Sequence, residues 1–113
     1  MKTKIIGLIH IIKRRPGMVF FNGANAALKD YIHFFEGVFY SLEFSYNVDF
    51  EREISKWYQK RIDFKAPNMN WFAQFEHINK DLSEIEKTNR FLDTLEDFFK
   101  NNNSLSEYKF QDH

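Results

Sequence analysis

The sequence has 113 residues, no cysteine and a net charge of zero, from 16 basic and 16 acidic side chains. The length fits one ordinary domain, and the 19 % aromatic content, including 14 phenylalanines, excludes a disordered chain. The lack of cysteine excludes disulfides, thiolate metal sites and cysteine nucleophiles. The balanced charge argues against a general nucleic-acid binder, which usually carries a basic excess.

The first predicted helix begins at Thr3, which caps it, and ends near Arg14. Its apolar side chains recur at helical spacing, at Ile5, Leu8, Ile9 and Ile12. This apolar run is far shorter than the ~20 residues of a membrane span. A secretory signal would have a small-residue cleavage site after its apolar run, whereas this run is followed by basic residues and has no such site. We therefore expect a cytoplasmic protein without a membrane partner.

The segment Arg15-Pro16-Gly17-Met18 ends this helix. Proline disfavours the helical conformation at the residue before it, and glycine tolerates a positive φ. We expect Met18 to fill a gap in the core. Residues 18–22 are expected to be extended, as a short two-stranded β ribbon, before the Asn22-Gly23 turn signal.

A second helix is predicted over residues 24–44, capped by Asn22 or Asn25. Gly37 in its middle costs about 1 kcal/mol relative to alanine, so we expect another helix to cross closely there. The apolar stripe of this helix is formed by Ala27, Tyr31, Phe34, Phe35, Val38, Phe39 and Leu42.

Three more helices are predicted. One covers residues 50–64 with Asp49 as its cap, and a shorter one covers residues 70–79 with Trp71, Phe72, Phe75 and Ile78 facing inward. Ser83 and Glu86 have capping-box spacing and open the last helix, which carries Ile85, Thr88, Leu92, Leu95 and Phe99 inward and ends at the asparagines 101–103. The tail 104–113 is expected to dock loosely or fray. The sequence thus predicts an all-α single domain, residues 1–113, built as a bundle of about five helices.

The sequence contains no recognisable catalytic constellation. The four glycines are scattered, and no serine lies in a nucleophile-elbow context. His33 and Glu36 lie one helical turn apart, but two ligands on an amphipathic helix arise easily by chance. We therefore predict no catalytic residue, no metal and no cofactor. An enzyme with an unfamiliar site at His33 and Glu36 remains an alternative.

Two groups of acidic residues are candidates for binding a partner. One surrounds the loop between the second and third helices: Glu43, Asp49, Glu51 and Glu53. The other is an outward stripe on the last helix: Glu86, Asp93 and Asp97, with Arg90 expected to pair within the helix with Glu86 and Asp93. A solvated helix face is the simpler explanation for any single member of either group.

The segment Arg15-Pro16-Gly17-Met18, after an amphipathic helix, resembles the Arg-Pro-Gly-Met signature of a group of small bacterial immunity proteins. These proteins protect cells against the toxins of contact-dependent growth inhibition and other polymorphic toxin systems. The resemblance continues over about residues 5–100, at Leu28, Phe34, Phe35, Gly37, Phe64, Asn70, Trp71, Phe98 and Phe99.

This resemblance implies an immunity protein, monomeric when free, that binds a cognate toxin domain and covers its active site or another essential surface. Many such toxins are nucleases with cationic clefts, which an acidic helix stripe or loop would complement, with Tyr46 or Tyr108 as aromatic anchors. The alternative is a helical regulatory or adaptor domain that binds nucleic acid or a protein through its basic N-terminal segment, Lys13, Arg14 and Arg15.

Overall fold

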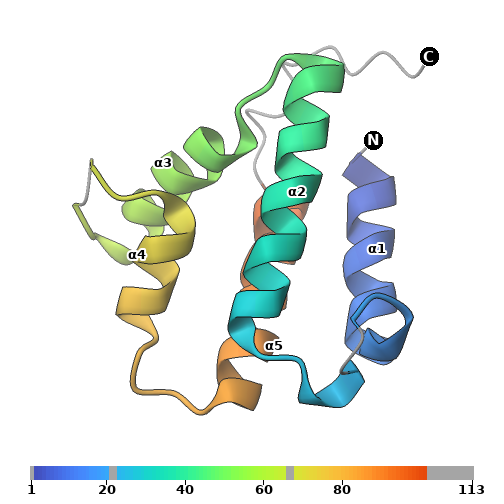
Figure 1. The fold of residues 1–113 in the computed structure, drawn as a ribbon. Coiled ribbons are helices and arrows are strands. Elements are labelled where there is room, and N and C mark those ends of the chain that lie inside the picture. The colour runs from blue at the N-terminus through green and yellow to red at the C-terminus, as the bar shows by residue number, and fades with distance from the viewer. Residues whose placement is uncertain (1, 21–22, 66–67, 102–113) are drawn as a thin grey trace.

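The computed structural model describes residues 2–20, 23–65 and 68–101, and in this part of the chain the fold is all-α (Figure 1). The α-helices are α1 (Lys2–Arg14), α2 (Leu28–Tyr46), α3 (Phe50–Ile62), α4 (Trp71–Ile78) and α5 (Glu84–Asn101). Two short 3-10 helices, η1 (Pro16–Met18) and η2 (Gly23–Asn25), connect α1 to α2. The predicted helical bundle is confirmed, whereas the tail 104–113 lies outside the described residues.

Helix α5 lies at the centre of the bundle, with α1 and α2 packed against it and α3 packed against α2 and α4 (Figure 1). The core consists largely of aromatic rings. Phe91 of α5 lies 5.8 Å from Phe35 of α2, 5.3 Å from Trp71 and 5.4 Å from Phe75, measured between ring centroids. These distances are typical of favourable ring contacts, so the many phenylalanines hold the helices to one another.

The β ribbon expected near residues 18–22 is wrong within the described residues, and Phe21 and Asn22 lie outside them. Pro16 opens η1, and its carbonyl accepts hydrogen bonds from the N–H groups of Val19 and Phe20. Proline is suited to the first position of a helical turn because its φ is preset. The chain therefore turns where we expected it to extend.

Met18 does not fill the core as expected, because its side chain is 68 % exposed. The η1 turn carries Met18 outward. Phe20, which follows, is buried instead, with its ring centroid 4.4 Å from Tyr31 and 5.7 Å from Phe34. The Arg-Pro-Gly-Met segment thus ends α1 as predicted, but its methionine does not pack in the core.

Helix α2 begins later than predicted, and its caps are carboxylates instead of an asparagine. Asp30 accepts a hydrogen bond from the N–H of Ala27 at 2.8 Å, and Glu84 of α5 accepts from the N–H of Leu28 at 3.0 Å. Both satisfy donors that a helix start leaves free. The second of these contacts depends on tertiary packing, which spacing along the chain does not reveal.

Three predicted contacts are wrong: the close helix crossing at Gly37 and the inward positions of Ile78 and Ile85. A Cβ atom built on Gly37 would meet nothing within 4 Å, because Gly37 faces away from the buried stripe of Tyr31, Phe35 and Phe39. Ile78, the last residue of α4, and Ile85, near the start of α5, are exposed, so neither side chain enters the core.

Two predicted helix starts are confirmed. The side chain of Asp49 accepts a hydrogen bond from the N–H of Arg52 at 3.1 Å and caps α3. The Ser83 hydroxyl accepts from the N–H of Glu86 at 3.2 Å, as a capping box requires. The Glu86 carboxylate, however, accepts from that same hydroxyl at 2.9 Å.

Candidate partner-binding surface

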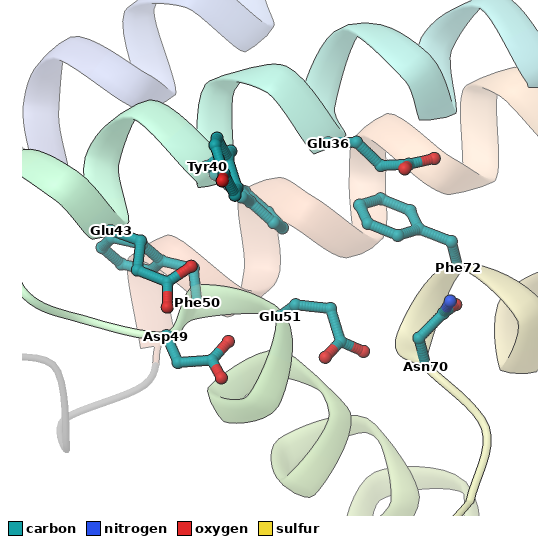
Figure 2. A pocket seen from close by; sticks show the side chains of 9 residues that line it. Glu36, Tyr40, Glu43, Asp49, Phe50, Glu51, Asn70 and Phe72 are labelled. Atoms are coloured by element: carbon teal, nitrogen blue, oxygen red, sulfur yellow. The ribbon is translucent and has the colours of Figure 1, made fainter.

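A hollow of about 270 Å³ lies at the corner where α2, α3 and the start of α4 meet (Figure 2). We call it the corner hollow. It is lined by four carboxylates, those of Glu36, Glu43, Asp49 and Glu51, together with Asn70 and the rings of Phe39, Tyr40, Phe50 and Phe72. None of these lining residues is basic, so the hollow concentrates negative charge between aromatic walls.

Helical geometry brings these side chains together. Glu36, Tyr40 and Glu43 have the spacing i, i+4, i+7 and therefore share one face of α2. Asp49 and Glu51 lie at the start of α3, and Asn70 caps the start of α4 by accepting from the N–H of Ala73 at 2.8 Å. Helix N-termini carry partial positive charge, which favours carboxylates at this corner.

Glu51 has a structural contact within the corner hollow. Its carboxylate accepts a hydrogen bond from the N–H of Trp71, the first residue of α4. Burial raises the pKa of the Glu51 carboxyl, the Trp71 N–H opposes that increase, and the nearby charge of Asp49 adds to it. This carboxylate therefore joins α3 to α4 in addition to lining the hollow.

Two large aromatic side chains lie exposed beside these carboxylates. Tyr40 is 64 % exposed and Phe44, one turn further along α2, is 78 % exposed. Their ring centroids lie 5.1 Å apart in an edge-to-face arrangement. The corner hollow together with Tyr40 and Phe44 forms what we call the corner surface, in which an apolar patch borders several carboxylates.

The predicted loop group is only partly assembled at this surface. Glu43, Asp49 and Glu51 line the corner hollow, whereas Glu53 does not. The expected anchor Tyr46 is partly buried and packs against the core, and Tyr108 lies outside the described residues.

Sequence reasoning missed Tyr40 and Phe44, and it considered Glu36 only together with His33, as an alternative enzyme site. The available signal was that positions 40 and 44 lie outside the apolar stripe predicted for the second helix, which leaves their rings without a core to enter.

The predicted stripe on α5 lines a different hollow, of about 520 Å³, next to the C-terminal halves of α3 and α4. Asp93 pairs with Lys13 of α1 at 2.5 Å, and Asp97 pairs with Arg61 of α3 at 2.9 Å. The guanidinium of Arg90 donates to Asn79 at 3.3 Å, where we had expected a pair within the helix. Two of the three predicted acids, Asp93 and Asp97, thus form ion pairs with other helices at the surface, while the exposed Glu86 belongs to the cap of α5.

His33 and Glu36 lie 3.8 Å apart at the surface of α2. Among the residues that the structure describes, no group of three or more histidine, aspartate or glutamate side chains is arranged to hold a metal ion.

None of the described helices is both long enough and apolar enough to cross a membrane. Comparison of the sequence and structure with models of protein families, with curated proteins and with solved structures found no match.

Proposed function

We propose that this protein is an immunity protein that binds a cognate toxin domain and neutralises it by covering its active site or another essential surface. The observation that carries the proposal is the corner surface, where Tyr40 and Phe44 lie exposed beside carboxylates. Aromatic side chains are enriched among the residues that dominate binding energies at protein interfaces. The resemblance of Arg15-Pro16-Gly17-Met18 and its surroundings to immunity proteins of polymorphic toxin systems supports the choice of a toxin as partner.

A nuclease-type toxin fits this surface best. Nucleases grip phosphates with basic side chains, so their clefts are cationic. The carboxylates of the corner surface would complement such a cleft and speed up association. Binding there would block the substrate without any chemistry by the immunity protein itself.

The test is co-expression with the toxin domain encoded beside this gene. We expect cells to survive and the two proteins to co-purify, whereas a toxin domain from an unrelated system should kill the cells and stay unbound. A catalytically inactive toxin variant allows the complex to be measured without killing. Continued killing by the cognate toxin, with no complex, would contradict the proposal.

A second candidate is a regulatory or adaptor domain that binds nucleic acid or a partner protein through its basic N-terminal segment. The observation in its favour is that Arg14 and Arg15 are both exposed at the end of α1, although Lys13 is paired with Asp93. For a nucleic acid, this candidate predicts a gel shift that weakens steeply with salt and is lost in an Arg14→Ala/Arg15→Ala variant. Unchanged mobility of DNA and RNA at low salt would exclude nucleic acid as the partner of this segment.

A further inference from the structure

We propose that the corner hollow receives an arginine side chain from the partner protein, with Tyr40 and Phe44 packing against apolar atoms around that arginine. This inference rests on the proposed function only in assuming that the partner is a protein. It identifies the surface that the partner contacts and the chemistry of the group that enters it.

The charge of the hollow is incompletely satisfied within the fold. No described residue pairs with the carboxylate of Glu43, and Glu36 has only the exposed imidazole of His33, at 3.8 Å. Asp49 and Glu51 each use one oxygen to accept from a backbone N–H, Asp49 with its Oδ1 and Glu51 with its Oε1. An ionised carboxylate accepts hydrogen bonds at both of its oxygens, so acceptors remain available for a cation.

The exposed ring of Tyr40 beside the carboxylates favours a guanidinium over other cations. Figure 2 shows the carboxylates of Glu43, Asp49 and Glu51 along one side of the hollow, with the ring of Phe72 between Glu51 and Glu36. A guanidinium is planar and weakly hydrated and stacks on rings, while its five N–H donors reach several acceptors at once. A lysine ammonium is a strongly hydrated point charge, so it would stack less favourably on an aromatic ring.

The size of the hollow and the spacing of its carboxylates disfavour two other kinds of occupant. At about 270 Å³ the hollow lies close to the lower limit of the roughly 300–1,000 Å³ of typical small-molecule sites, and it is open at the surface. Its carboxylates are not grouped so that three could share a metal ion. A single arginine side chain, whose N–H donors all lie in the plane of the guanidinium, fits both observations.

The exposed rings explain how such a contact becomes part of an interface. Tyr40 lines the hollow, and Phe44 packs against Tyr40 at 5.1 Å between ring centroids. A partner whose arginine enters the hollow would cover both rings and exclude water from the ion pairs. Exclusion of water strengthens these pairs, as at the centre of known interfaces.

The first experiment uses a small probe and the protein alone, so it is independent of any toxin. The amide resonances of uniformly ¹⁵N-labelled protein are followed while N-acetyl-arginine amide is added, with the neutral N-acetyl-citrulline amide as control. We expect shifts of residues around Tyr40, Glu43 and Phe72 with arginine and none with citrulline. Glu43→Gln should remove these shifts, whereas Glu76→Gln, at an exposed position of α4, should leave them unchanged. Shifts spread evenly over the acidic residues, or none at the corner, would overturn the inference.

The second experiment measures the complex with the inactive toxin by calorimetry. Glu43→Gln and Tyr40→Ala should each weaken binding about tenfold or more, since both side chains line the hollow that the arginine would enter. The matched variants Glu76→Gln and Ile85→Ala, which change an exposed acid and an exposed apolar residue elsewhere, should change affinity less than about twofold. Replacing the partner's arginines one at a time should identify one whose loss is not additive with Glu43→Gln.

The outcomes separate the two proposals. A stable complex whose affinity is unchanged by Glu43→Gln and Tyr40→Ala would overturn the arginine site and leave the immunity function standing. Absence of any complex would overturn the immunity function, while the probe titration would still decide whether the hollow binds a guanidinium.

Discussion

At the scale of single residues, two glycines occupy opposite kinds of position. Gly23 has a φ of +53°, and a Cβ added there would lie 3.6 Å from the backbone of Gly17. Gly37 lies in the middle of α2, has no positive φ and would place a Cβ in open space. The first position requires glycine, and the second does not.

Gly37→Ala should therefore stabilise the protein by about 0.5–1 kcal/mol, because alanine loses less backbone entropy on forming a helix. Gly23→Ala should destabilise it by about 1–2 kcal/mol, since a left-handed conformation is unfavourable for residues with a Cβ. Urea unfolding of the two variants beside the wild type measures both effects. A loss of stability in Gly37→Ala would mean that this position has a packing role that the structure does not reveal.

The phenylalanines also divide into two kinds. Phe91 is fully buried and contacts rings from α2 and α4, whereas Phe44 is 78 % exposed. Phe91→Ala should cost about 3–5 kcal/mol because it removes apolar contacts and leaves a cavity. Phe44→Ala should change stability by less than about 0.5 kcal/mol. Thermal and urea unfolding check this matched pair, and equal losses in both variants would contradict the assignment of Phe44 to a binding surface.

At the scale of helices, α1 and α5 are joined by charges around Glu96. Its carboxylate contacts His10 at 2.5 Å, Lys13 at 3.5 Å and Lys100 at 3.3 Å. Burial by itself would raise the pKa of Glu96. Hydrogen bonds from Lys100 and His10 and the charge of Lys13 outweigh burial and lower it below the ordinary value of 4.5.

Because the pKa of Glu96 is lowered in the folded state, its contribution to stability is present above about pH 4.5 and is lost as the pH falls through the folded value. We expect Glu96→Gln to cost about 1 kcal/mol at pH 7 and progressively less in acid. Urea unfolding at several pH values measures this difference, with Asp81→Asn, in the exposed turn before α5, as a control. A cost independent of pH would show that packing of Glu96, and not its charge, stabilises the contact.

At the scale of the whole molecule, a net charge of zero conceals a separation of charge. All charged residues of α1 are basic, whereas the corner hollow between α2, α3 and α4 is lined by acids and by no base. Such a distribution steers a charged partner to one face without a large net charge.

Under the proposed function, association with the toxin should therefore depend on salt. Raising the ionic strength from about 0.05 M to 0.5 M should slow association roughly tenfold and change dissociation much less. Stopped-flow mixing with the inactive toxin measures both rates. The double variant Glu36→Gln/Glu43→Gln should associate more slowly and with a weaker dependence on salt, whereas Glu86→Gln on α5 should behave as the wild type. If Glu86→Gln weakened the salt dependence and the double variant did not, the charge that steers association would lie on α5.

Local signals in the sequence predicted most of the secondary structure. Period and capping residues predicted five helices, the end of α1 before Pro16 and the cap of α3 at Asp49, because these features depend on neighbours within one or two turns. The start of α2 was missed because one of its caps, Glu84, comes from α5. The turn after Pro16 was missed because an apolar run of three residues fits a strand and a buried turn equally well.

The sequence by itself therefore determined an all-α chain with an aromatic core and the acidic residues available for a surface. Only the tertiary structure decided which acids meet. Asp93 and Asp97 are paired with bases from α1 and α3, while Glu36 and Glu43 gather beside Asp49, Glu51 and the exposed Tyr40. The physical reason is that helix formation depends on nearby residues, whereas a charge becomes structural or available for binding according to which distant helix packs against it.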